Sequence, residues 1–188
     1  MDTQTSAELS PTEFLPGTSV IYAMHGKCMV LGTETRSLGG QTLEFYKLEM
    51  KKTSPTRSTR GESAIWVPVA NARDQGLRRP MSPSEAELAL KALMSREYFF
   101  KINDSWSSLL PTLEEVIRKE GGLGLAKVAS FLYVYRRKQF TVPAEATKLQ
   151  DLVNKFLLKE LSEALQDTTK NIEIKIAKGL KTKLLPDH

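Results

Sequence analysis

The segment Phe14-Leu-Pro-Gly-Thr-Ser-Val-Ile-Tyr-Ala-Met-His-Gly-Lys-Cys-Met-Val-Leu31 decides the fold of the first half of the chain. It contains two short β-prone runs, at residues 20–22 and 28–31, separated by the turn-prone pair His25-Gly26. Short runs of β-branched and aromatic residues bounded by turn residues are typical of consecutive strands. The segment therefore predicts that the chain begins with a β-domain.

The residues that follow extend this pattern. Gly39-Gly40 can supply the positive φ angles of a tight hairpin, and residues 42–50 then alternate as a returning strand. A polar loop at 51–62 precedes a further strand at 64–67, where Pro68 favours an edge or a strand end. This spacing predicts a small Tudor- or SH3-like β-barrel over residues 14–79, preceded by a flexible N-terminus at 1–13.

Beyond residue 80 the apolar residues recur at helical spacing. Ser82 followed by Glu85, with Pro83 between them, is a capping box that opens a helix running to about residue 97. A short helix at 113–119 is expected to stop at Gly121-Gly122, followed by helices at 123–138 and from 141 to about 166. The fold class is therefore α+β, with an all-α domain at 80–166.

Residues 167–188 form a Lys-rich tail. Its isoleucines alternate, at positions 172, 174 and 176, so a strand-like arm, a helix extension and disorder are all open.

The composition of the chain indicates what kind of partner it suits and where in the cell it is expected. The 188 residues carry 27 Lys and Arg against 22 Asp and Glu, a net charge of +5 that suits an acidic partner without requiring one. A single cysteine fits a reducing cytosol, and neither a signal peptide nor an apolar membrane-spanning run is visible. We expect a cytoplasmic protein without membrane contact, and a monomer, because no heptad seam is present.

Residues suited to catalysis are scarce. His25 and Cys28 are close in sequence, but nothing orients them as a nucleophilic pair, so a turn histidine and a buried structural cysteine are the simpler interpretation. Residues 121–124, Gly-Gly-Leu-Gly, lack the Lys-Ser/Thr of a phosphate loop. With only two histidines and one cysteine, no zinc site is expected. We expect no enzyme activity, no metal and no cofactor.

Two features remain for binding. Trp106 lies in a polar stretch, Lys101-Ile-Asn-Asp-Ser-Trp-Ser-Ser-Leu109, so it either caps a local core or is displayed to a partner. Basic residues at 136–138 either complement a helix dipole or contact phosphate, and those at 47, 51, 52, 57 and 60 are either solvated or bind an acidic partner.

The order of several motifs resembles the CarD/CdnL family of bacterial transcription factors, whose N-terminal module is shared with the transcription-repair coupling factor. The matching motifs are residues 14–22 (FLPGTSVIY), His25-Gly26, residues 30–34 (VLGTE), residues 45–48 (FYKL) and residues 65–69 (IWVPV) followed by Asn71. In the second half they are Trp106-Ser107, a helix stop near Gly121 and two further helices. The resemblance covers roughly residues 14 to 166.

The resemblance implies a function. The N-terminal barrel of this family docks on the β subunit of RNA polymerase by strand pairing, and the matching contact positions are Arg36, Leu38 and Trp66. The helical domain lies on promoter DNA, where a Trp matching Trp106 wedges into the minor groove at the upstream edge of the bubble and stabilises the open complex. Ser107 adjoins that contact.

The chain also departs from the family pattern. Serines replace the basic residues that follow the family's Trp, so Lys101 and Arg96 are the candidate replacements for phosphate contact, and Pro111 interrupts a helix that continues in the family. The lack of basic residues after Trp106 favours one alternative function, that of an adaptor that binds polymerase or another protein without a DNA wedge. A second alternative is a single-stranded nucleic-acid-binding protein, which predicts aromatic side chains clustered on one face of the barrel.

Overall fold

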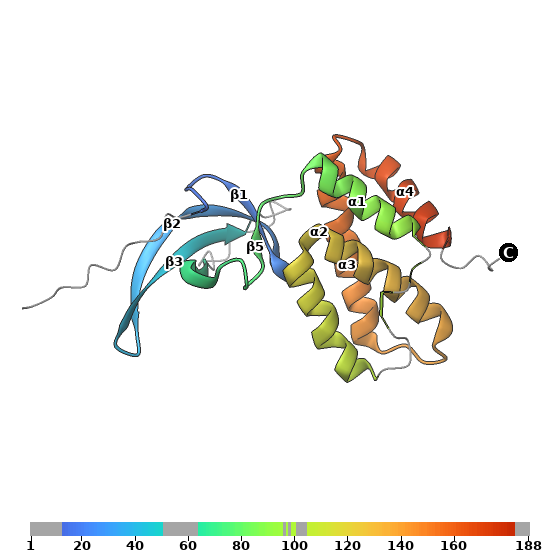
Figure 1. The fold of residues 1–188 in the computed structure, drawn as a ribbon, viewed down its shortest axis with the longest axis horizontal. Coiled ribbons are helices and arrows are strands. Elements are labelled where there is room, and N and C mark those ends of the chain that lie inside the picture. The colour runs from blue at the N-terminus through green and yellow to red at the C-terminus, as the bar shows by residue number, and fades with distance from the viewer. Residues whose placement is uncertain (1–12, 51–63, 96, 98, 101–104, 183–188) are drawn as a thin grey trace, which may run out of the picture.

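In a computed structural model, the described residues are 13–50, 64–95, 97, 99–100 and 105–182. They form an N-terminal sheet domain followed by a helical domain, placed side by side along the long axis (Figure 1). The strands are β1 Ser19–Tyr22, β2 Gly26–Leu38, β3 Gln41–Met50, β4 Ile65–Pro68 and β5 Leu77–Arg78. The helices are η1 Ala23–His25, η2 Val69–Asn71, α1 Pro83–Met94, α2 Trp106–Lys138, α3 Ala144–Ala164 and α4 Thr169–Thr182. The predicted α+β class, with a β-domain before a helical domain, is confirmed.

The five strands of the described residues pair antiparallel in the order β4-β3-β2-β1-β5. The hairpin of β2 and β3 turns at Gly39 and Gly40, whose φ angles are 60° and 81°. Both angles are unfavourable for residues with a Cβ, so the glycine pair determines where the hairpin turns. The predicted hairpin is confirmed. One face of the sheet buries a small core: Phe14, Val20, Cys28, Val30, Tyr46, Leu48, Val67, Ala72 and Leu77.

The N-terminal end of this domain is anchored before β1. Glu13, the last residue of the segment predicted to be flexible, accepts two hydrogen bonds from the Arg73 guanidinium, at 2.7 and 2.5 Å. The pairing lowers the pKa of the Glu13 carboxyl, chiefly through these hydrogen bonds. Residue 13 therefore belongs to the folded domain, and residues 1–12 of the predicted flexible segment lie outside the described residues.

Helix α1 begins as predicted. The Ser82 hydroxyl accepts from the Glu85 backbone N–H, and the Glu85 carboxylate accepts from the Ser82 backbone N–H at 2.7 Å. Pro83 follows in the first helical position, where its missing N–H costs nothing. The Glu85 carboxylate accepts from the Ser82 backbone N–H and also from the Ser82 hydroxyl, at 2.8 Å, and these two hydrogen bonds lower the pKa of the Glu85 carboxyl. The capping box is confirmed.

Helix α2 is a helical hairpin. Gly121 has φ 58° and ψ −123°, so the chain turns there between two helical arms, which confirms the predicted stop. The first arm starts at Trp106, well before the expected residue 113, and Pro111 lies inside it. The expectation that Pro111 interrupts the helix is wrong. Pro111 removes one helical hydrogen bond, to the carbonyl of Ser107, and both residues are exposed, so water can satisfy that carbonyl.

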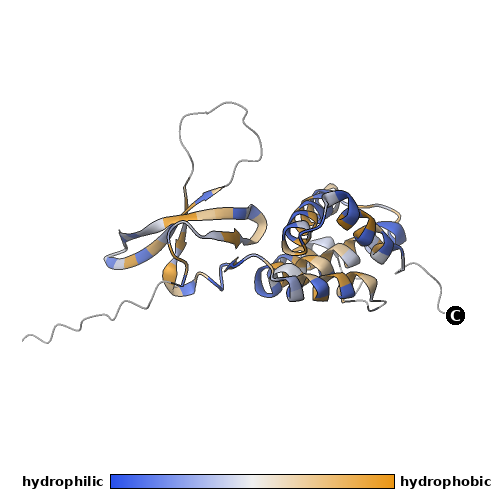
Figure 2. Ribbon diagram, turned by 90° about the horizontal axis from the view of Figure 1, so that it is seen from above, coloured by the Kyte–Doolittle hydropathy of each residue, from blue (hydrophilic) through white to orange (hydrophobic). Residues whose placement is uncertain are grey.

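Residues 169–182, expected as part of a separate tail, form helix α4. Ile172, Ile176 and Leu180 are buried in the core of the helical domain, against α1 and α3. Their spacing of four places them on one helical face, whereas the alternation with Ile174, which is exposed, is coincidental. The helical domain therefore extends to residue 182. Figure 2 shows hydrophobic and hydrophilic residues interspersed along its helices, as in helices that bury one face only.

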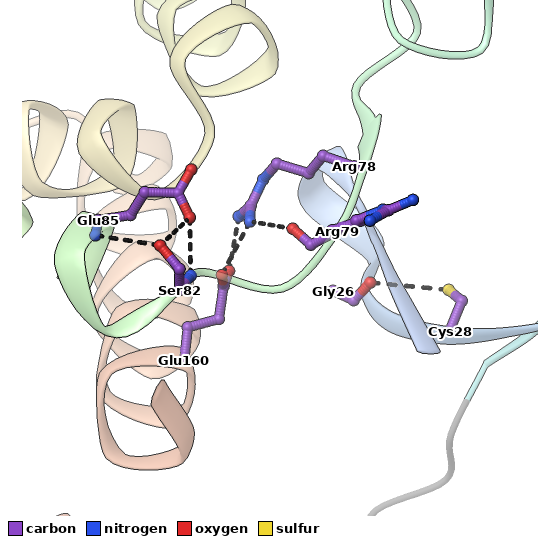
Figure 3. A network of polar contacts seen from close by, with 7 residues as sticks. All are labelled: Gly26, Cys28, Arg78, Arg79, Ser82, Glu85 and Glu160. Atoms are coloured by element: carbon purple, nitrogen blue, oxygen red, sulfur yellow. Dashed lines mark hydrogen bonds and ion pairs between the residues drawn. The ribbon is translucent and has the colours of Figure 1, made fainter. Parts of the chain in front are cut away.

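The two domains contact one another through the corner of α2 and one face of α3. Phe156, Glu160 and Glu163 are spaced i, i+4, i+7 on α3 and meet the sheet domain. Glu160 is 6% exposed and accepts two hydrogen bonds from the Arg78 guanidinium, at 2.9 and 2.7 Å. Figure 3 shows Arg78 reaching Glu160 beside the cap of α1, while Arg79 points away.

Three further contacts cross the same boundary. Lys27 pairs with Glu163 at 2.6 Å, the Arg118 guanidinium donates to the Asp74 carbonyl at 2.6 Å, and Met24 of η1 packs against the helical core. Contacts from η1, β2 and β5, distributed over α2 and α3, restrict rotation of one domain about the other. The sheet domain therefore presents the helical domain in a defined orientation.

Candidate functional site

The outer face of the sheet, away from the small core, gathers two of the predicted polymerase-contact residues. Arg36 pairs with Leu43 in the β2–β3 register, and Lys47 pairs with Trp66 in the β3–β4 register. Side chains alternate between the faces of a strand, so Leu43 and Lys47 share a face, and with them their partners Arg36 and Trp66. Residues separated by 30 positions in sequence are thus brought together.

Arg36 and Trp66 are in direct contact. The Arg36 guanidinium carbon lies 3.5 Å from the centroid of the Trp66 ring, and the Lys47 ammonium lies 5.2 Å from the same centroid. Two cations on one indole are a favourable arrangement, because the negative ring face offsets their charge. The Arg36 side chain remains 40% exposed, with Glu34 at 3.5 Å. We call Arg36, Lys47 and Trp66 the outer-face cluster.

Lys47 was predicted only as one of several basic residues that are either solvated or bind an acidic partner, and it was not placed beside Trp66. The alternation of residues 42–50 could have placed Lys47 on the Trp66 face. Leu43, 37% exposed, adds an apolar side chain beside the cluster. Leu38, the third predicted contact residue, ends β2 opposite Gln41. Its side chain lies outside the described part of the structure, so the structure brings together only Arg36 and Trp66 of the predicted set.

A free strand edge adjoins the outer-face cluster. Strand β4 is an edge of the sheet, and within the described residues it pairs only with Phe45–Leu48 of β3. In the part of the chain that the structure describes, the first part of β3, residues 41–44, therefore has a partner strand on the β2 side alone. Unpaired N–H and C=O groups of this kind are suited to accept a strand from another chain.

The predicted DNA-contact residues lie on the helical domain. Trp106 is the first residue of α2, partly exposed, with its ring centroid 5.8 Å from that of Tyr135 on the second arm of α2. Its indole Nε1 is buried, with no acceptor among the described residues. Ser107 beside it is exposed, and Arg96 and Lys101 lie outside the described residues.

Trp106 lies far from the interface between the domains. Both ends of α2 lie at the end of the helical domain away from the sheet, and the Gly121 corner lies near the sheet (Figure 1). Trp106 is thus packed within the helical domain, against Tyr135 and the helical core. Of the predicted DNA-contact set, the described residues contain only Trp106 and Ser107, which are neighbours in sequence.

The candidate nucleophile does not have the environment that catalysis requires. Cys28 is 1% exposed, and burial raises the pKa of its thiol, which favours the unreactive protonated form. His25 stacks on Tyr22 with the ring centroids 4.9 Å apart. The interpretation of Cys28 as a buried structural cysteine is confirmed. No cluster of three metal-ligating side chains occurs among the described residues.

The remaining basic groups divide by location. Lys51, Lys52, Arg57 and Arg60 lie outside the described residues, whereas Arg136, Arg137 and Lys138 form the last turn of α2 and are exposed. The aromatic side chains of the sheet domain are not gathered on one displayed face. Tyr46 and Phe14 are in the core, Phe45 is buried, Arg36 covers Trp66, and Tyr22 is partly buried against His25. No helix in the described part of the chain is long and apolar enough to cross a membrane.

The sheet domain has a counterpart among known protein families. Residues 14–81 match the CarD-like/TRCF RID domain family, which is the RNA polymerase-interacting domain of CarD-like factors and of the transcription-repair coupling factor. The sheet domain belongs to this family, whose members interact with the polymerase β subunit. The chain is therefore a transcription-associated factor that carries an RNA polymerase-binding domain. No curated protein matches the chain.

Proposed function

We propose that the protein docks on the β subunit of RNA polymerase through its outer-face cluster and the adjoining strand edge, and stabilises the promoter open complex. The observation that carries the proposal is the stacking of Arg36 and Lys47 on Trp66, within a domain of the polymerase-interacting family. Trp and Arg dominate the binding energy of many protein interfaces, and here each holds the other in place before a partner arrives. The active form is a cytoplasmic, nucleoid-associated monomer.

Docking brings the helical domain to the DNA. The contacts between the domains support this step, because they hold the helical domain, and Trp106 with it, in a fixed orientation relative to the sheet domain. Tethering raises the local concentration of the helical domain at the promoter, so a net charge of +5 is sufficient for a DNA contact.

In the proposed contact with DNA, the side chain of Trp106 acts as a wedge. Trp106, supported by Tyr135 and with Ser107 beside it, inserts in the minor groove at the upstream edge of the bubble. A side chain that binds unstacked DNA better than intact duplex shifts the equilibrium towards the open state. A side chain with equal affinity for both forms of DNA would leave this equilibrium unchanged. Unstacking costs a few kcal/mol per step, so a partial contribution lengthens the life of the open complex.

Trp106→Ala is expected to shorten the open-complex lifetime on a ribosomal RNA promoter to nearly that without the factor, while polymerase binding is unchanged. The measurement is the decay of competitor-resistant complexes with the cognate polymerase. Trp106→Phe, which keeps an aromatic ring against Tyr135, is the matched control and is expected to retain part of the effect. Wild-type lifetimes for Trp106→Ala would contradict the wedge.

A specific observation favours a second function, that of a polymerase-binding adaptor without a wedge. Trp106 already packs against Tyr135, and exposed serines at 107 and 108 stand where phosphate-binding cations would be expected. The lifetime experiment separates the two functions, because an adaptor binds polymerase without lengthening the lifetime of the open complex.

A further inference from the structure

Phe140 is the most exposed large apolar side chain among the described residues. It is 105% exposed, whereas the others range from 37% to 61%. It lies in the connection between the end of α2 at Lys138 and the start of α3 at Ala144. Single exposed apolar side chains are common on protein surfaces, so the meaning of Phe140 depends on its surroundings.

Two guanidinium groups are held in place immediately before it. Arg136 Nη1 donates to Gln150 Oε1 at 2.8 Å. The Arg137 guanidinium lies 3.5 Å from the centroid of the Tyr133 ring and donates to the Tyr133 carbonyl at 3.0 Å. Each guanidinium has five N–H donors, so most remain for an anion. These cations are therefore both exposed and preorganised.

The same arginines line a groove of about 720 Å³ between α2, α3 and α4. Lys155 and Lys181 are also on its wall, and Glu173 is the acidic residue that lines it. Four cations against one carboxylate give the groove a net positive charge. A polyanion is the partner that this charge favours.

We propose that Phe140, Arg136 and Arg137 form a second nucleic-acid contact, in which Phe140 stacks on an exposed base at a junction of duplex and single strand. The two arginines bind the adjoining phosphates, and the strand continues along the basic groove. Base stacking on an aromatic side chain next to basic residues is a sequence-tolerant way to bind an unpaired strand. An acidic protein would use the same charges but has no base to stack on Phe140.

This inference rests on the proposed function, because docking on polymerase brings the helical domain to melted DNA. The position of Phe140 is consistent with it. The end of α2 lies with its beginning at the end of the helical domain away from the sheet (Figure 1), and Phe140 follows Tyr135, the residue that supports Trp106. One surface would thus contact both the edge of the duplex and the adjacent unpaired base.

The test is the affinity of the full-length protein for labelled fork-junction DNA and for a duplex of the same sequence, by fluorescence anisotropy at low ionic strength without polymerase. Wild type is expected to prefer the fork. Phe140→Ala should weaken fork binding about tenfold with little effect on the duplex, and Phe140→Trp should restore it. Arg137→Glu should weaken binding to both DNAs, because it removes a phosphate contact.

Ile174→Ala is the matched control, since Ile174 is also an exposed apolar side chain but lies on α4. It should bind both DNAs as wild type does. Wild-type fork affinity for Phe140→Ala, or no preference of the wild type for the fork, would overturn the inference. If poly-glutamate displaced the fork equally well from wild type and from Phe140→Ala, the inference would also be overturned, because only polyanion binding would have been shown.

Failure of this inference can be distinguished from failure of the proposed function. The fork measurement needs no polymerase, and Phe140→Ala is expected to bind polymerase as wild type does. A protein that binds forks through Phe140 but leaves the open-complex lifetime unchanged would contradict the proposed function alone.

Discussion

Gly121→Val is expected to lower the free energy of unfolding by about 4 kcal/mol, the largest effect of any single substitution considered for this chain. The residue has φ 58°, which a β-branched residue adopts only under strain. A Cβ there would also lie 2.7 Å from Cδ and Nε of Arg78. Arg78 cannot move away without losing its bonds to Glu160, so the substitution strains the α2 corner and the domain interface together.

Chemical denaturation followed by circular dichroism measures the loss. Gly39→Val is the matched control, because Gly39 has φ 60° but no atom within 4 Å of the added Cβ. Gly39→Val should lower the free energy of unfolding only by the backbone strain, about 1–2 kcal/mol. Equal losses for the two variants would show that Arg78 is free to move and that the interface is not tightly packed.

Glu160→Ala is expected to destabilise the protein by about 3 kcal/mol and to loosen the two domains. The substitution leaves the Arg78 guanidinium without its carboxylate in a site where the side chain is 22% exposed. Removing one member of a buried pair costs more than the pair itself contributes, because the remaining charge is desolvated without compensation. Breaking a buried ion pair costs about 3–5 kcal/mol, and because Arg78 is partly accessible to solvent, we expect a loss at the lower end of this range.

Denaturation gives the stability, and the distance between dyes placed on the two domains gives their relative freedom. Glu163→Ala removes an ion pair three residues along the same helix, but its side chain is 44% exposed, so the loss should stay below about 1 kcal/mol. A loss of stability for Glu160→Ala as small as that for Glu163→Ala would contradict a role of the buried Arg78–Glu160 pair in holding the two domains together.

Much of the fold follows from local signals in the sequence. The Gly39-Gly40 turn, the Ser82–Glu85 capping box and the Gly121 stop each depend on backbone angles or hydrogen bonds within a few residues, and each is confirmed. Such features are encoded locally, so a single sequence reveals them.

Tertiary contacts account for what the sequence did not reveal. Helix α4 has few local signals apart from its apolar face, and burial of Ile172 and Ile176 against α1 and α3 is what stabilises it. Pro111 was expected to break a helix, yet it costs one hydrogen bond at an exposed position. The Arg78–Glu160 pair joins residues 82 positions apart, for which no pattern in the sequence gives a signal.

The same distinction holds for the candidate site. Arg36 and Trp66 were predicted from the resemblance as separate contact positions, and the strand register then places them in van der Waals contact on one face. Lys47 joins them only through its pairing with Trp66. Phe140 could not be singled out from sequence, because exposure of an aromatic residue in a connection between helices depends on how the helices pack.

The central claim is that the outer-face cluster binds the polymerase β subunit, and the most direct test is the affinity of the full-length protein for the cognate polymerase by surface plasmon resonance. Arg36→Glu is expected to weaken binding at least 30-fold, about 2 kcal/mol, because it replaces the stacked cation with a carboxylate beside Glu34. Arg79→Glu changes the charge equally at an exposed residue outside the cluster, and it should bind as wild type does. If Arg36→Glu bound polymerase as tightly as Arg79→Glu, the outer-face cluster would not be the docking surface.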